Sequence, residues 1–175
     1  MIGRTLTRRA LPITFGLKVA NWLVELVGAL ESLHEDSSKL SIQLAGPSGT
    51  MAKFGGRGVQ VRKHTAKMLG LANPQFPWHT NRQQVIRLSV GLNLLCTSLG
   101  KIAQDVALLG QDEIGELNEI NPPGRGGSSA MSHKNNPTSA QQALLAVGRA
   151  KSGASNLLMA PIPEYERSIQ GWQAE

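Results

Sequence analysis

The sequence has a single cysteine and few aromatic residues. Cys96 stands alone, which excludes an intrachain disulfide, and it lies in an apolar run where we expect it to be buried as a small hydrophobe. Phe, Trp and Tyr make up 4% of the 175 residues, whereas Leu, Ala, Val and Ile are abundant. This composition favours packed helices over an aromatic-rich β-sandwich or barrel.

The sequence also lacks long apolar runs and dense clusters of charge. No uninterrupted apolar run reaches the roughly 18 residues of a membrane span, so we predict no membrane association. The first residues lack the apolar block and cleavage site of a secretory signal, so we predict a cytoplasmic location. The net charge is +6, but Lys and Arg are scattered, so we predict no nucleic-acid partner. A small anionic substrate fits this charge equally well.

The spacing of apolar residues predicts four helices, at residues 12–35, about 60–69, 80 to about 120, and from 137 onward. In the third helix, apolar residues from Val85 to Leu109 step by three and four, which is a heptad seam. With its predicted bounds of residues 80 to about 120, this helix would have about 40 residues, or ~60 Å of length. We therefore expect an all-α protein built as an elongated bundle of long helices, without strands.

The apolar seam of the third helix also bears on assembly. A helix of this length needs other long helices beside it, from the same chain or from copies of it. Monomers rarely tolerate a long exposed apolar stripe. We therefore expect a homo-oligomer.

A polar stretch, NPPGRGGSSAMSHKNNP at residues 121–137, separates the last two predicted helices. Connections in compact domains are usually about 4–6 residues long. Ser128 and Ser129 offer hydroxyls, Lys134 offers a cation, and Asn136 is suited to cap the next helix, whose free N–H groups favour anions. Two interpretations stay open: a flexible solvated linker, or a lid that closes over a small molecule carrying carboxylates.

Two segments resemble motifs of the fumarase/aspartase superfamily. Residues 127–137, GSSAMSHKNNP, resemble its signature loop, GSSxMPxKxNP, with Ser132 in place of proline. Residues 3–16, GRTLTRRALPITFG, resemble a second motif, GRTHxQxAxPxTxG. PWHTNR at 77–82 and ERSIQGWQAE at 166–175 look like the lactonising, cycloisomerase branch of that family. The resemblance spans the chain, and family members are longer. We therefore expect residues 1–175 to be a partial central helical-bundle domain, without the family's N-terminal domain and C-terminal helices.

The resemblance implies an enzyme that forms or cleaves a bond beside a carboxylate through a carbanion. Ser128 matches the family's general base, and Lys134 and Asn136 match positions that bind the substrate carboxylate. Lys134 is thus expected to act in catalysis together with Ser128. Further substrate contacts are implied for Ser129, Met131, Arg4, Thr5, His79 and Arg82. The family also implies a homotetramer whose active sites collect residues from three subunits.

The lactonising branch implies that one carboxylate of a tricarboxylate muconate adds across the conjugated diene, without metal or redox cofactor. The four histidines are far apart and unaccompanied by Cys, so no metal site is predicted. No phosphate-binding GxxxxGK motif is present, and no cofactor is predicted.

The sequence departs from the family pattern at several positions. Leu6 stands where many lyases of the family carry a histidine, which counts against a fumarate-releasing lyase. Arg8 replaces the usual glutamine, and Asn135 replaces the branch's usual arginine. Three hypotheses stay open: a cycloisomerase, an adenylosuccinate lyase-like C–N lyase, or a catalytically incomplete helical oligomerisation module derived from such an enzyme.

Overall fold

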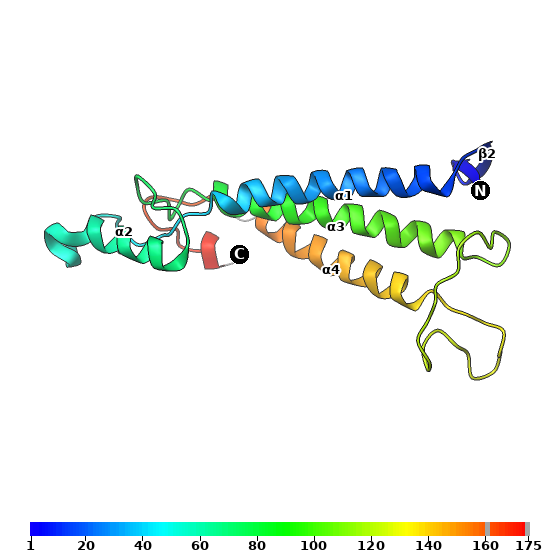
Figure 1. Cartoon of the computed structure of the whole chain (residues 1–175). Coiled ribbons are helices and arrows are strands. Elements are labelled where there is room, and N and C mark those ends of the chain that lie inside the picture. Colours follow the sequence, from blue (N-terminus) through cyan, green and yellow to red (C-terminus); the bar gives the residue numbers. More distant parts are fainter. Residues whose placement is uncertain (160–161, 174–175) are drawn as a thin grey trace. The chain divides into compact units, whose positions relative to one another are not determined.

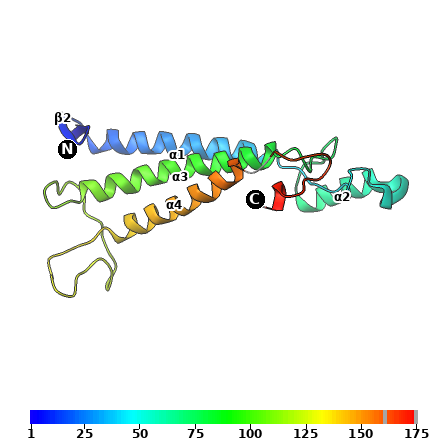
Figure 2. The same ribbon diagram turned by 180° about the vertical axis from the view of Figure 1, so that it is seen from behind.

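The structure is a computed structural model that describes residues 1–159 and 162–173 (Figures 1 and 2). Its elements, in chain order, are β1 Ile2–Thr5, β2 Arg8–Pro12, α1 Phe15–Ser38, the 3-10 helix η1 Ala52–Arg57, α2 Gly58–Leu69, α3 Gln83–Leu109, α4 Thr138–Met159 and the 3-10 helix η2 Gly171–Gln173. The long helices confirm the predicted all-α class.

The chain divides into two compact units. Unit 1 comprises Met1–Leu30 and Leu94–Lys151, and unit 2 comprises Glu31–Asn93 and Ser152–Glu175. The helices α1, α3 and α4 each contribute residues to both units. The helix contacts and polar residues of each unit are therefore described separately.

The expectation of no strands is wrong at the N-terminus, where β1 and β2 form an antiparallel hairpin. Its two-residue turn, Leu6 and Thr7, has φ values of 48° and 64°, the positive range that tight hairpin turns require. Such turns usually carry Asn or Gly, so the sequence lacked the usual signal. Because Pro12 belongs to β2, α1 begins only at Phe15, where the Thr14 hydroxyl accepts the N–H of Leu17 at 3.0 Å.

The third helix is shorter than predicted. It contains 27 residues and ends at Leu109, where the heptad pattern also ends. Beyond it the chain folds back, because the N–H groups of Glu116 and Leu117 both donate to the carbonyl of Leu109, at 3.0 and 3.2 Å. Gly115 has a φ of 58°, which suits glycine in this turn.

In unit 1, small residues let the helices approach closely. A Cβ atom placed on Gly100 of α3 would lie 3.1 Å from a methyl carbon of Val147 of α4. Between α1 and α3, the indole N–H of Trp22 donates to the carboxylate of Asp105 at 3.0 Å. Burial raises the pKa of Asp105, but hydrogen bonds from Lys101 and Trp22 outweigh this and lower it. Asp105 is therefore held as a charged partner inside the helix packing.

In unit 2, the same helices approach through other small residues. A Cβ on Gly91 of α3 would lie 3.2 Å from the side chain of Leu33 of α1. The Ser89 hydroxyl donates to the carbonyl of Ala154 in α4 at 3.4 Å. Small residues of α3 therefore let α1 and α4 approach it closely in this unit.

The larger apolar residues of α3 remain partly exposed within the single chain. Leu92 is 47% exposed in unit 2, and Leu99 is 43% exposed in unit 1. Among residues 1–159 and 162–173, α3 alone is long and apolar enough to cross a membrane by length and composition. Core helices of soluble proteins pass the same test.

We expect Gly100→Val to destabilise the chain by about 1–3 kcal/mol, because its side chain would overpack against Val147. Gly148→Val in α4 is the matched control, because nothing lies within 4 Å of its Cβ position. Urea denaturation measures both variants. An equal loss of stability in the two would contradict the close approach of α3 and α4.

Candidate active site

Asparagine side chains tie together the two ends of the signature loop. We call residues 118–121 and 135–138 the loop neck, and residues 122–134 the loop tip. The Asn121 amide donates to the side-chain oxygen of Asn135 and to the carbonyl of Asn136, both at 2.8 Å. The Asn135 amide donates to Asn118 at 2.7 Å and to the Glu119 carbonyl at 2.8 Å. The loop thus has the closed base of an Ω-loop.

One glycine and one asparagine complete the neck. The backbone N–H and the side-chain amide of Asn136 both donate to the carbonyl of Gly126, at 2.8 Å each. Gly126 is buried with a φ of 74°, and a Cβ there would clash with the Asn121 side chain. The prediction that Asn136 caps the fourth helix is wrong, because α4 begins at Thr138 and the N–H groups of Ser139 and Ala140 donate to Glu119 instead.

The cap of α4 comes instead from Glu119. Its carboxylate accepts the N–H groups of Ser139 and Ala140 at 2.6 and 3.1 Å, two of the donors that a helix start leaves free. Desolvation raises the pKa of Glu119, but these bonds and the hydroxyls of Ser139 and Thr138 outweigh it and lower the pKa. The helix mouth that was expected to attract a substrate anion already holds an anion from the chain itself.

The loop tip carries the predicted catalytic residues. The half-buried Ser128 accepts the N–H of Ala130 on its hydroxyl at 3.3 Å. Ser129, Met131 and Lys134 are exposed, and the Lys134 backbone N–H donates to the Met131 carbonyl at 3.2 Å. Within the described parts of the chain, the Lys134 ammonium makes no ion pair or hydrogen bond. The tip therefore presents an uncommitted cation and a hydroxyl on one loop.

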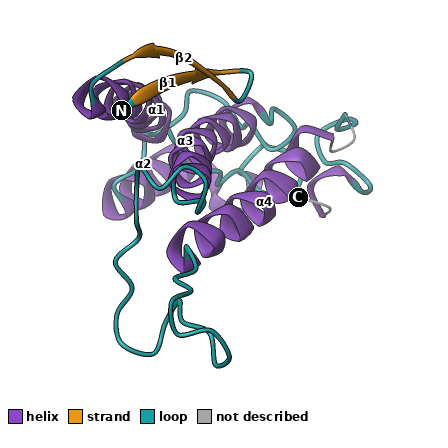
Figure 3. Ribbon diagram, turned by 90° about the vertical axis from the view of Figure 1, so that its right-hand side faces the viewer, coloured by secondary structure: helices purple, strands orange, loops and turns teal. Residues whose placement is uncertain are grey.

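The hairpin carries Arg4 and Thr5. The Arg4 guanidinium binds Glu116 through two parallel bonds of 2.9 and 3.0 Å, and the Ile2 N–H donates to the same carboxylate at 3.4 Å. The hydrogen bond from Arg4 lowers the pKa of Glu116. Figure 3 shows the hairpin on one side of the helices and the signature loop leaving on the other. One chain therefore does not bring Arg4 and Thr5 together with the loop tip.

His79 and Arg82 belong to unit 2. The His79 ring packs edge-to-face on Trp172, with ring centroids 5.3 Å apart. The Arg82 guanidinium lies 5.8 Å from the Trp78 ring centroid and donates to the His79 carbonyl at 3.2 Å. The structure thus brings these two predicted residues together on one segment.

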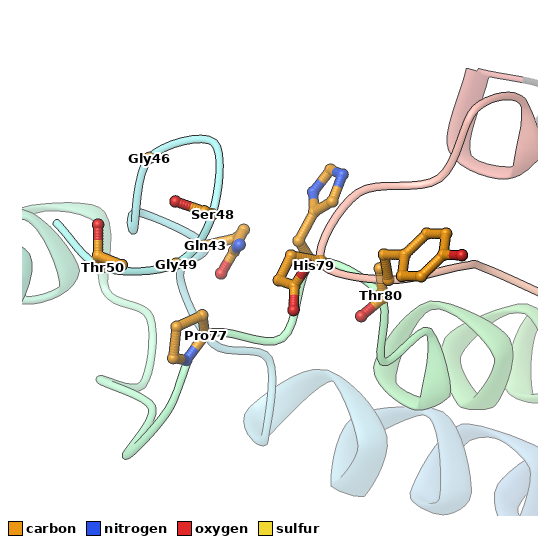
Figure 4. Close-up of a pocket in the computed structure, with 10 residues that line it drawn as sticks. Gln43, Gly46, Ser48, Gly49, Thr50, Pro77, His79 and Thr80 are labelled. Atoms are coloured by element: carbon orange, nitrogen blue, oxygen red, sulfur yellow. The ribbon is translucent and has the colours of Figure 1, made fainter.

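A cavity of about 330 Å³ lies in unit 2 beside His79 (Figure 4). Its lining is polar and apolar in about equal parts and consists of Gln43, Gly46, Ser48, Gly49, Thr50, Pro77, His79, Thr80, Tyr165 and Glu166. Sequence reasoning missed the hydroxyls of Ser48, Thr50 and Thr80. The sequence signal that could have revealed them is the run AGPSGT at residues 45–50. In the structure Gly46 and Gly49 have φ values of 76° and 80°, which let this loop fold around the cavity.

Comparison with known proteins assigns the chain to a family. Residues 1–151 match the family model described as "Lyase". The chain belongs to this lyase family, the fumarase/aspartase superfamily. The signature loop and the hairpin, which carry the two motifs of the resemblance, both lie inside the matched region.

Individual relatives include enzymes of two reaction types. The chain is 42% identical over 176 residues to 3-carboxy-cis,cis-muconate cycloisomerase of Pseudomonas aeruginosa, covering 100% of this chain and 38% of the relative. It is 37% identical over 186 residues to nitrosuccinate lyase of Streptomyces davaonensis, covering 100% and 39%. The crystal structure of 3-carboxy-cis,cis-muconate lactonizing enzyme from Pseudomonas putida matches with a TM-score of 0.88 at 38% identity, covering 99% and 39%. The chain thus spans less than two fifths of these relatives.

We expect Glu119→Gln to lower the stability of the chain at pH 7 by about 1 kcal/mol, because α4 loses its charged cap. The folded pKa of Glu119 is lowered, so its contribution is present above the unfolded value near 4.3 and is lost as pH falls through the folded pKa. Urea denaturation at pH 7 and pH 3 measures both effects.

The exposed Glu113, changed to Gln, serves as the control for this carboxylate. The difference between wild type and Glu119→Gln should shrink at pH 3, while Glu113→Gln should match wild type at both values. A difference for Glu119→Gln that stays constant with pH would rule out the charged cap.

Proposed function

We propose that the chain carries the signature-loop part of a cycloisomerase that converts 3-carboxy-cis,cis-muconate to 4-carboxymuconolactone. The observation that carries the proposal is the loop tip, which presents the Ser128 hydroxyl and the uncommitted Lys134 ammonium above a tied neck. The names of relatives such as that of P. aeruginosa support this substrate. Leu6, which cannot transfer a proton, fits a cycloisomerase better than a lyase that needs a histidine there.

The proposed step is an internal addition. One carboxylate oxygen of the muconate forms a C–O bond to a diene carbon, and the π electrons move onto the neighbouring carbon beside another carboxylate. A proton then joins that carbon, so no atom is lost. Ser128 would hold the proton, and Lys134 would stabilise the charge that develops on the carboxylate. Substrate contacts are proposed for Ser129, Met131, Asn136, Arg4, Thr5, His79 and Arg82.

We propose that copies of the chain share each site, in a homotetramer. The hairpin and the loop tip lie on different sides of the helices in one copy, so a second copy would have to join them. The exposed seam of α3, with Leu92 and Leu99, supplies an apolar surface for such contacts.

We expect Leu99→Glu to dissociate the oligomer, because a charge in the apolar seam would be buried without a partner. Met68→Glu is the control, since this apolar side chain is 87% exposed at the end of α2, outside the seam. Size-exclusion chromatography with light scattering measures the mass. A monomeric wild-type chain would contradict the shared site.

A C–N lyase is the second candidate. The 37% identity to nitrosuccinate lyase supports an elimination that cleaves a C–N bond beside a carboxylate. An adenylosuccinate lyase-like activity belongs to the same reaction class. The third possibility is a helical oligomerisation module without turnover.

A chimera tests the function directly, because the chain spans 38% of the P. aeruginosa relative. The matching segment of that enzyme is replaced by residues 1–175, and the loss of ultraviolet absorbance of 3-carboxy-cis,cis-muconate is followed. We expect turnover, and we expect Ser128→Ala in the chimera to reduce kcat by about 10²–10⁴-fold, as for loss of the group that transfers the proton. Ser132→Ala in the same loop should change kcat little.

Each outcome separates the candidates. An assembled chimera that is silent on the muconate but releases fumarate from adenylosuccinate would establish the lyase. An assembled chimera without activity on either substrate would favour the third candidate, the oligomerisation module. Unchanged kcat in Ser128→Ala would remove the proposed role of the loop hydroxyl.

A further inference from the structure

Three arginines are among the residues that line an open surface cavity at the tip of the hairpin. This cavity of unit 1, about 470 Å³ in volume, is lined by Arg4, Thr7, Arg8, Arg9 and Ile114. Arg8 stands where the family motif usually has glutamine, so the charge here exceeds what the motif requires. The cavity therefore has the lining of an anion site rather than that of an apolar pocket.

Only one of these charges is neutralised. Arg4 forms its paired bonds with Glu116, whereas Arg8 and Arg9 have no ion pair with any residue that the structure describes. Arg9 also lies directly opposite Arg4 in the strand register. Like charges at opposed positions of a ladder are unfavourable. The repulsion between these arginines is therefore reduced when an anion binds to the two free guanidiniums.

The backbone at the tip is also held in an unusual conformation. Leu6 and the β-branched Thr7 both have positive φ, a region that such side chains rarely enter. The Thr7 hydroxyl donates to the Leu6 carbonyl at 2.6 Å, which helps to hold the turn. Strained backbone of this kind gathers at binding sites, where the surrounding structure maintains it. The turn fixes the start of β2, and with it the positions of Arg8 and Arg9.

We propose that Arg8 and Arg9 form a subsite for carboxylate groups of a polycarboxylate ligand. This inference rests on the proposed function and names the part of the site that would hold the substrate's non-reacting carboxylates. Each guanidinium presents a planar pair of donors that matches one carboxylate. Two free guanidiniums therefore suit a ligand with at least two carboxylates. Arg4, whose guanidinium already binds Glu116, would contact the ligand beside this subsite rather than neutralise one of its carboxylates. Glu116 also fixes the hairpin to the turn that leads into the loop neck.

Titration calorimetry of the 175-residue chain tests the subsite with propane-1,2,3-tricarboxylate at constant ionic strength. We expect Arg8→Gln and Arg9→Gln each to weaken binding about tenfold, because each removes one paired contact. Arg149→Gln removes the same charge from an exposed position of α4 and should weaken binding less than twofold. Arg8→Lys, which keeps the charge and loses the planar fork, should bind with intermediate affinity. Inorganic phosphate in a parallel titration should bind more weakly than the tricarboxylate.

Several results would overturn the subsite. These are absence of tricarboxylate binding to the wild-type chain, equal losses in Arg8→Gln and Arg149→Gln, or tighter binding of phosphate. Amide NMR shifts outside the hairpin should stay unchanged in each variant, which shows that the fold persists. If binding depends on Arg8 and Arg9 but the chimera has no activity, the proposed function is rejected and the subsite is not. If the chimera turns over the muconate but the chain shows no such binding, the subsite is rejected and the proposed function is not.

Discussion

The carboxylate of Glu119 is the contact on which the candidate site depends. It caps α4 from the first half of the loop neck, so it joins the two ends of a long polar connection to a rigid element. The amides of Asn121 and Asn135 add bonds across the same neck. A loop tied at its base can keep its tip close to one place while the tip itself changes conformation. This reconciles a glycine-rich loop with the positioning that chemistry requires.

The packing of the helices is compatible with the proposed assembly of several copies of the chain. Buried positions along α3 are largely small, such as Ser89, Gly100 and Ala103, whereas Leu92 and Leu99 stay partly exposed. Small residues allow close approach within the chain, and the exposed leucines would be available for the proposed contacts with other copies. The hairpin and the signature loop leave the helices on different sides (Figure 3), which fits a site shared between copies.

The sequence predicts well what depends on local periodicity. The helices α1, α2 and α4 lie within a few residues of their predicted positions, and the polar loop before α4 stands out by composition. The predicted third helix is too long because its extension beyond Leu109 had no heptad pattern to support it, and the turn at Gly110 and Gly115 follows Leu109 directly. The hairpin was missed because Leu6 and Thr7 occupy a turn that usually carries Asn or Gly.

Features that join distant segments could not be predicted. The cap of α4 comes from Glu119, far outside the local capping pattern that made Asn136 the obvious choice. The unit 2 cavity gathers the 43–50 loop, the 77–80 turn and residues 165–166, which no spacing rule connects. The proposed roles of Ser128 and Lys134 come from the family resemblance. Composition alone does not decide whether the loop is a linker or a lid.

The most direct test of the tied loop is backbone ¹⁵N relaxation across residues 118–138. We expect order parameters of about 0.85 for the neck residues, which include Asn121 and Asn135, and below about 0.6 for the tip around Ser128. Uniformly low values from neck to tip would show that the amide and carboxylate bonds do not hold the loop base. The central claim would then be contradicted.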